Sequence, residues 1–259
     1  MIRKLPILTL LILAACASDQ LFDNGGGTSG FGDRDPVEWQ QGHAPHRYEV
    51  HGIDVARFQD SVNWQAARDA GVQFAFIKAT EGGDMLDPRF GDHWRGARSV
   101  SIPRGAYHFF YFCTSAADQA RWFVRNVPRE TGALPPVLDM EWNPFSPTCR
   151  KRPRSEIVRR EAKVFLDTLE RHYGQRPIIY TTPEFYRENE MQQMEHEEFW
   201  LRSTAKHPRK VYPSQQWSFW QYTGTATVPG INGDVDLNAF SGGLSEWKRW
   251  LAIRSQKPG

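Results

Sequence analysis

Apolar runs alternate with amphipathic segments along the first two thirds of the chain. The runs are rich in β-forming residues, which is typical of buried strands. We expect strands at residues 48–55, 72–79, 102–112, 134–142 and 177–181. The segments between them have the periodicity of surface helices. We expect helices at residues 64–70, 88–98, 115–127 and 155–173.

This alternation stops after residue 181. Residues 199–201, 216–221 and 234–237 predict strands with little helix between them, and residues 244–252 predict a closing helix. Strands that alternate with helices predict a parallel sheet, and about eight strands favour its closure into a barrel. We therefore predict an α/β fold, a modified TIM-like barrel in which about five (β/α) units precede strands with few helices. A doubly wound open sheet is the alternative.

The first residues have the pattern of an export signal. Arg3 and Lys4 precede an apolar run that is too short to span a bilayer and that ends in Leu13-Ala14-Ala15-Cys16. This resembles the signal of a bacterial lipoprotein, in which the cysteine becomes the lipidated first residue; an ordinary signal peptide is the alternative. The resemblance implies a membrane anchor at Cys16. Because Ala17 follows, it also implies an exported protein on the periplasmic face of the outer membrane.

Composition divides the chain into three parts. Residues 1–15 are the expected signal peptide, residues 16–47 a lipidated cysteine with a flexible, glycine-rich tether, and residues 48–255 the barrel domain. Cys113 and Cys149 then remain, and an exported protein can join such a pair. The sequence leaves open whether they meet in space.

Charge and histidine spacing exclude some partners. The net charge is +2, with 32 basic and 30 acidic residues, which is not the basic field of a nucleic-acid-binding protein. His51 and His108 stand near strand ends without the clustered ligands of a metal site, so we expect structural histidines, no metal and no cofactor. We also expect a monomer.

Acidic residues stand where strands are predicted to end, and barrel enzymes have their active sites there. Asp139 and Glu141 follow the apolar run at residues 134–138. Alternate strand residues share a face, so both carboxyl groups point into one mouth, roughly 6–7 Å apart. Two such acids repel each other as anions, which raises one pKa. A protonated acid beside an ionised one is what glycosidic cleavage needs, although solvated acids or half of a metal site remain alternatives.

Other predicted strands end in polar or aromatic residues that would surround this pair. Asp54, Tyr107, Tyr180 and Asp236 are the candidates for substrate contacts. Trp220 begins a late motif, and an indole offers both a large apolar face and an N–H donor. Groove lining and core packing are both open for Trp220. Lys78, near the end of the second predicted strand, is expected to pair with an acid.

Short motifs stand at successive strands between about residues 49 and 252. They are His51-Gly52-Ile53-Asp54-Val55, Phe76-Ile77-Lys78-Ala79-Thr80-Glu81-Gly82, Arg104-Gly105-Ala106-Tyr107-His108-Phe109, Leu138-Asp139-Met140-Glu141, Pro177-Ile178-Ile179-Tyr180-Thr181, Trp220-Gln221-Tyr222-Thr223 and Val235-Asp236-Leu237-Asn238. In this order the motifs resemble the glycoside hydrolase family 25 lysozymes, the Chalaropsis-type muramidases.

The resemblance implies an activity and a division of roles. These enzymes cleave the β-1,4 bond between N-acetylmuramic acid and N-acetylglucosamine in peptidoglycan glycan strands, without a cofactor. Motif matching implies that Glu141 is the general acid and Asp139 its assisting carboxylate. It also places Asp54, Asp236, Tyr107 and Tyr180 in the groove. Whether the anomeric centre is retained, inverted or attacked by the substrate's own acetamido group stays open.

Two segments depart from the family pattern. Arg202-Ser203-Thr204 stands where the family often has alanine and an aromatic residue, and the loop at residues 143–154 is long and basic. That loop is either a solvated surface or a contact for anionic peptide stems or a membrane surface. A glycosidase for another N-acetylated glycan and a cell-wall-binding lipoprotein without turnover remain the alternative functions.

Overall fold

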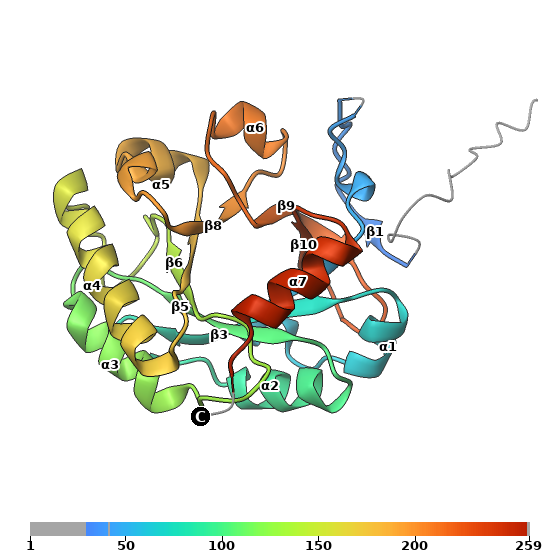
Figure 1. The fold of residues 1–259 in the computed structure, drawn as a ribbon, viewed down its shortest axis with the longest axis horizontal. Coiled ribbons are helices and arrows are strands. Elements are labelled where there is room, and N and C mark those ends of the chain that lie inside the picture. The colour runs from blue at the N-terminus through green and yellow to red at the C-terminus, as the bar shows by residue number, and fades with distance from the viewer. Residues whose placement is uncertain (1–29, 41, 258–259) are drawn as a thin grey trace, which may run out of the picture.

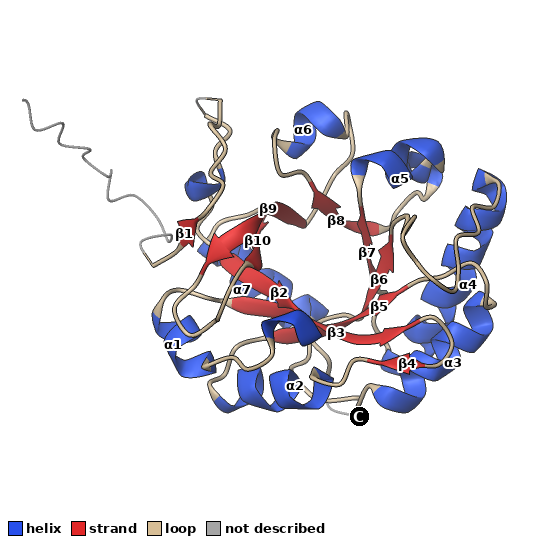
Figure 2. Ribbon diagram, turned by 180° about the vertical axis from the view of Figure 1, so that it is seen from behind, coloured by secondary structure: helices blue, strands red, loops and turns tan. Residues whose placement is uncertain are grey.

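Eight strands close into a ring in the computed structural model, which describes residues 30–40 and 42–257. Around the ring the order is β9-β10-β2-β3-β5-β6-β7-β8, and β8 pairs back onto β9 (Figure 1, Figure 2). The strands are β2 (His51–Val55), β3 (Phe74–Glu81), β5 (Arg104–Phe109), β6 (Val137–Met140), β7 (Ile178–Thr181), β8 (Glu198–Arg202), β9 (Phe219–Thr227) and β10 (Val235–Phe240). The predicted TIM-like barrel is confirmed, and the open sheet is excluded.

Helices cover the outside of the ring (Figure 1). They are α1 (Trp64–Asp69), α2 (Phe90–Ser99), α3 (Ala116–Asn126), α4 (Ser155–Tyr173), α5 (Pro183–Glu188), α6 (Pro208–Val211) and α7 (Leu244–Arg254). The strands β2, β3, β5, β6 and β7 are each followed by one of α1 to α5, whereas only the short α6 separates β8 from β9. The five predicted (β/α) units and the loss of helices after them are therefore confirmed.

Local signals account for the clearest helix boundaries. Ser115 caps α3, because its side chain accepts a hydrogen bond from the backbone N–H of Asp118. The apolar stripe of α4 is buried against the barrel. Gly174 ends α4 with a positive φ of 70°, a conformation that costs glycine little. The sequence missed α5, a short helix that begins at Pro183.

The last strand runs against its neighbours. Adjacent strands from β2 through β3, β5, β6, β7 and β8 to β9 are parallel, whereas β10 is antiparallel to both β2 and β9. Asp236 therefore stands near the start of β10, not at its end as the sequence suggested, and it pairs in register with Asp54. The reversed direction brings Asp236 to the end of the barrel where the parallel strands finish.

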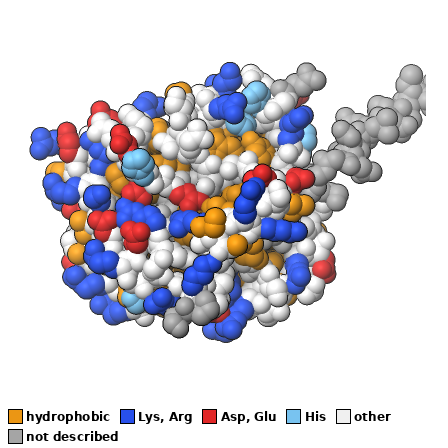
Figure 3. Space-filling view, viewed as in Figure 1, with side chains coloured by type: hydrophobic (Ala, Val, Ile, Leu, Met, Phe, Trp, Pro, Cys, Tyr) orange, Lys and Arg blue, Asp and Glu red, His pale blue; other side chains and the backbone are white. Residues whose placement is uncertain are grey.

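Aromatic side chains fill the end of the barrel that lies opposite to where the parallel strands finish. Phe76 stacks on Trp200 with 4.6 Å between the ring centroids, and Phe219 contacts Phe76 at 5.1 Å. Trp247 of α7 packs against Phe74, so α7 lies across this end of the barrel (Figure 1). This end of the barrel is thus a packed core. On the face that carries α7, acidic and basic side chains are interspersed (Figure 3).

The segment before the barrel is partly structured. β1 (Gly32–Asp33) pairs with the outer part of β9, and Trp39 packs edge-on against Trp220 with 5.2 Å between their rings. The prediction of a free tether up to residue 47 therefore does not hold for β1 and Trp39, which contact β9. The predicted signal peptide, Cys16 and the glycine-rich stretch up to residue 29 lie outside the described residues. Of the helices described, none has the length and apolar character to cross a membrane.

Candidate active site

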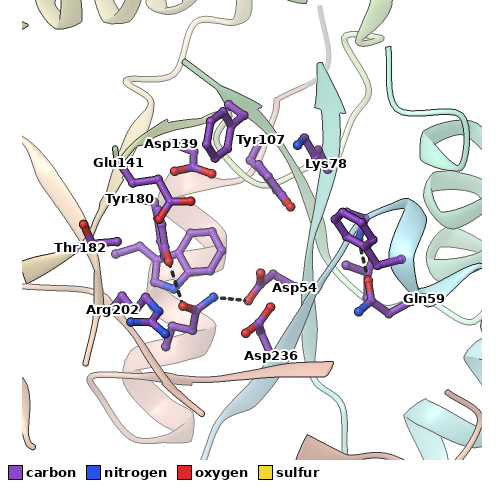
Figure 4. A pocket seen from close by; sticks show the side chains of 16 residues that line it. Asp54, Gln59, Lys78, Tyr107, Asp139, Glu141, Tyr180, Thr182, Arg202 and Asp236 are labelled. Atoms are coloured by element: carbon purple, nitrogen blue, oxygen red, sulfur yellow. Dashed lines mark hydrogen bonds between the residues drawn. The ribbon is translucent and has the colours of Figure 1, made fainter. Parts of the chain in front are cut away.

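A pocket of about 410 Å³ opens where the parallel strands end (Figure 4). All eight barrel strands contribute residues to its lining, which gathers residues that lie far apart in the sequence. Its ionisable residues are Asp54, Lys78, Tyr107, Asp139, Glu141, Tyr180, Arg202 and Asp236. Six of the seven predicted groove residues are thus brought together, and Trp220 is the exception.

Asp139 and Glu141 line the same pocket, as strand alternation predicts. Asp139 belongs to β6 and is only 6% exposed, and Glu141 directly follows that strand. Burial raises the pKa of Asp139 well above its usual range, and the Glu141 carboxylate raises it further. Burial also raises the pKa of Glu141 to about 6, although Arg202 and Lys78 oppose this rise. The pair therefore holds a proton under conditions where carboxyl groups in water are ionised.

Within the described residues, Oδ1 of Asp139 is buried without a hydrogen-bond donor. An unsatisfied buried acceptor costs free energy, so such atoms are rare in folded proteins. In a pocket of this size, a donor on a bound ligand is the partner that would satisfy it.

A second acid pair faces the first across the pocket (Figure 4). Oδ2 of Asp54 accepts hydrogen bonds from Gln221 Nε2 at 3.0 Å and from Asn238 Nδ2 at 2.8 Å. Burial nevertheless raises the pKa of Asp54 to about 6. Burial, followed by repulsion from Asp54, raises the pKa of Asp236 to about 8. Asp236 is therefore a proton donor at neutral pH.

Two cations and two phenols complete the charged part of the pocket. Lys78 lies 2.7 Å from Glu81, which confirms the expected pairing with an acid. The Tyr180 hydroxyl donates to Gln221 Oε1 at 2.9 Å. Burial raises the pKa of both Tyr107 and Tyr180 well above that of a free phenol. These phenols stay neutral and can exchange hydrogen bonds with the hydroxyl groups of a sugar.

The chain matches the family model for glycosyl hydrolases family 25 over residues 53–231. It belongs to this family. The protein YegX of Escherichia coli K12 is 37% identical over 212 residues, which cover 80% of this chain and 75% of that protein. Lysozyme M1 of Streptomyces globisporus is 34% identical over 220 residues, 79% of this chain and 71% of that protein.

A solved family 25 glycosyl hydrolase from Bacillus anthracis has the same fold. It superposes with a TM-score of 0.74 at 35% identity and covers 83% of this chain and 99% of its own. The chain is therefore a glycoside hydrolase, and its pocket of four carboxyl groups is the candidate active site.

Trp220 does not line the groove of this family 25 hydrolase. Its side chain is fully buried, and its Nε1–H donates to the carbonyl of Ser203 at 2.8 Å. On β9 the inward position belongs to Gln221, and Trp220 therefore points outward to Trp39. Of the two readings the sequence left open, core packing is correct, and the assignment of Trp220 to substrate binding is wrong.

Trp200 on β8 is the tryptophan that this hydrolase places in the groove. It lines the pocket, and its Nε1–H donates to Asn238 Oδ1 at 2.7 Å. Arg202, two residues later on the same strand, shares its face and also lines the pocket. The alternation of β8 carries the signal for this pair, but nothing in the sequence says which face of that strand is inward.

Phe58 is a further groove residue that the sequence did not single out. It lies on a short 3₁₀ helix, Arg57–Gln59, directly after β2, and its side chain is 74% exposed at the pocket. An exposed aromatic ring at the edge of a polar pocket offers an apolar face to a sugar ring. The sequence signal was its position three residues after the first motif.

The buried histidines have structural partners in the family 25 hydrolase. His51 hydrogen-bonds with the Tyr48 carbonyl and the Tyr222 hydroxyl, and His108 with Thr80 and Gln119. Burial lowers the pKa of both imidazoles to about 4, so both are neutral. Over the described part of the chain, no group of three acidic, histidine or cysteine residues is placed to hold a metal ion.

Proposed function

We propose that this family 25 hydrolase is an N-acetylmuramidase that cleaves the β-1,4 bond between N-acetylmuramic acid and N-acetylglucosamine in peptidoglycan. The observation that carries the proposal is the buried pair of Asp139 and Glu141, whose raised pKa values keep a proton available beside a pocket for sugars. The name of its relative, Lysozyme M1, supports the same substrate.

Glu141 is the proton donor in this proposal. With a pKa of about 6, it is protonated in a useful fraction of molecules near neutral pH and can protonate the leaving glycosidic oxygen. Lys78 and Arg202 lower its pKa again, so the carboxylate that remains after proton transfer is stabilised. That carboxylate can then accept a proton from the water that completes hydrolysis.

Asp139 assists from deeper in the pocket. Its Oδ1 lacks a donor within the described residues, and the N–H of an acetamido group on the sugar would supply one. A hydrogen bond to a carboxylate favours its charged form. The ionised Asp139 then stabilises the positive charge that develops at the anomeric carbon.

Digestion of purified peptidoglycan tests bond and activity together. After borohydride reduction and mass analysis, we expect new reduced ends on muramic acid. Glu141→Gln should lower the rate at least about 100-fold, the usual contribution of a general acid. The exposed Glu195→Gln is the matched control and should retain full activity.

Other outcomes identify the alternatives. Reduced ends on glucosamine would contradict the muramidase. Binding to peptidoglycan without any new ends would identify a cell-wall-binding protein, and full activity of Glu141→Gln would refute the assignment of the acid.

We also propose that the hydrolase is exported and anchored through lipid on Cys16 to the periplasmic face of the outer membrane. The support is sequence alone: a basic start, a short apolar run and the Leu13-Ala14-Ala15-Cys16 segment. An anchored muramidase would meet the peptidoglycan layer from the membrane side.

A further inference from the structure

The loop at residues 143–154 forms a second cavity beside the active site. This cavity of about 160 Å³, here named the basic side pocket, is lined by residues from the β5–α3 connection and from the loop, among them Tyr111, Glu141, Trp142, Arg150, Lys151 and Arg152. Glu141 lines both this cavity and the active-site pocket. A ligand at Glu141 would therefore lie beside the basic side pocket.

Several contacts fix the loop that carries the basic residues. A disulfide joins Cys149 to Cys113, so the two cysteines that the sequence left open do meet. Asn143 Nδ2 donates to the Tyr111 hydroxyl at 2.8 Å, and the Cys149 N–H donates to Ser146 Oγ at 3.1 Å. The basic residues are thus carried on a tied segment, which lowers the entropy lost when they bind a ligand.

The positive charge of this pocket is only partly compensated. Arg152 lies over the Trp142 ring and is 3.5 Å from Glu184. Across residues 30–40 and 42–257, no carboxylate lies within 4 Å of the side-chain nitrogens of Arg150 or Lys151. Arg150 instead donates through Nε to the Ser146 carbonyl at 2.7 Å, which leaves its two terminal nitrogens for another acceptor.

We propose that the basic side pocket binds a carboxylate of the peptide stem of peptidoglycan through Arg150 and Lys151. This rests on the proposed muramidase function, because peptidoglycan sugars are N-acetylated and uncharged, whereas the stem on each muramoyl residue carries free carboxylates. The uncompensated cations of the basic side pocket therefore attract an anionic stem. The stem thereby helps to set which way the glycan lies across Glu141.

A membrane surface is the competing partner for the basic loop. The tip of the loop carries Phe145, which is 89% exposed. However, Arg150 and Lys151 line a cavity that shares Glu141 with the active-site pocket, and a lipid bilayer meets a protein over an open face. The position of the cations therefore favours the peptide stem of the substrate over a membrane surface as their binding partner.

Two forms of one substrate test the proposal. Peptidoglycan is compared before and after its stem carboxylates have been converted to amides, which keeps the stem and removes its charge. We expect wild type to bind and cleave the charged form roughly 3- to 10-fold better, mainly through KM, as two exposed ion pairs allow. Arg150→Gln with Lys151→Gln should abolish this preference by raising KM for the charged form alone. The preference should also shrink with added salt.

A matched double variant and a binding assay complete the design. Arg160→Gln with Lys163→Gln removes two exposed charges from α4 and should keep the preference. Co-sedimentation of the Glu141→Gln protein with both insoluble substrates measures the same preference without turnover, so failure of the muramidase function is seen separately.

The proposal would be overturned if wild type bound and cleaved the charged and the amidated peptidoglycan equally well. A double variant at Arg150 and Lys151 that keeps the preference would also overturn it. If that variant loses only its binding to vesicles of anionic phospholipid, the loop is a membrane contact and the stem proposal fails.

Discussion

Asp139 and Glu141 stand two residues apart but meet different surroundings. Asp139 lies within β6, is almost fully buried and has an unsatisfied oxygen among the described residues. Glu141 lies just beyond the strand, and Arg202 is the strongest influence that opposes the rise of its pKa. The side chain closer to solvent and to cations is the better proton donor, because it can release a proton without leaving an uncompensated buried charge.

This difference predicts a pH dependence. The acid must be protonated in the free enzyme, so kcat/KM should fall as pH rises above about 6, approaching tenfold per unit. The Arg202→Gln substitution removes a guanidinium that lowers the pKa of Glu141. The decrease of kcat/KM should therefore begin at a higher pH in this variant. The measurement is kcat/KM on soluble glycan fragments between pH 4 and pH 9.

Arg187→Gln is the control for that shift, because Arg187 is exposed and does not line the pocket. Its profile should match that of wild type. If kcat/KM of Arg202→Gln decreases at the same pH as that of wild type, a group other than Glu141 controls the pH dependence.

Alternation along a strand identified one pair of groove residues and missed another. The Asp139 and Glu141 pair was predictable because acids at positions i and i+2 after an apolar run share the solvent end of a strand. Trp200 and Trp220 were not distinguishable in this way. Each stands in a strand with two buried faces: one face packs in the barrel interior and the other packs against outer segments. Hydrophobicity therefore does not indicate which face points into the barrel.

At the scale of elements, the direction of β10 completes the groove. A parallel β10 would carry Asp236 to the opposite end of the barrel, away from Asp54. The antiparallel pairing instead places the two carboxyl groups in register and close enough for each to affect the pKa of the other. The short connection between β9 and β10, residues 228–234, allows this reversal, because antiparallel neighbours need no crossover helix.

The disulfide between Cys113 and Cys149 is the second such feature among the elements, and it leads to a stability prediction. It closes a loop of 36 residues, and the chain-entropy relation assigns such a loop about 3–4 kcal/mol. Cys113→Ser with Cys149→Ser should therefore lower the free energy of unfolding by about that amount, as measured by urea denaturation. The same variant should reduce the preference for charged stems, because the basic loop loses its tie to the β5–α3 connection.

Reductant provides the control for this experiment. It should destabilise wild type to the level of the double serine variant and leave that variant unchanged. A wild type that is equally stable with and without reductant would contradict the prediction.

At the scale of the whole molecule, the chain before the barrel is an integral part of the fold from residue 30 onward. β1 extends the sheet at β9, and Trp39 covers the outer face of Trp220. The arrangement explains why an indole that looked available for sugar is buried.

The proposed anchor gives a prediction about the complete protein. In a Gram-negative host, wild type should incorporate labelled palmitate and fractionate with outer membranes. Cys16→Ser should lose both the label and the membrane association, because acyl chains supply the anchoring free energy. Its activity on peptidoglycan should be unchanged, which separates anchoring from catalysis. Retention of label by Cys16→Ser would refute the assignment.

The sequence by itself determined the period of most elements, the order of five strands with the four helices between them, and the acids Asp139 and Glu141 at the end of the fourth strand. These are local properties, since side-chain periodicity and capping depend on a few neighbouring residues. Only the tertiary structure decided which face of β8 and β9 points inward, that β10 runs backwards, that Cys113 meets Cys149 and that the chain from residue 30 covers the barrel. Each of these depends on contacts between segments far apart in the sequence, and such contacts are selected by the packing of the closed barrel as a whole.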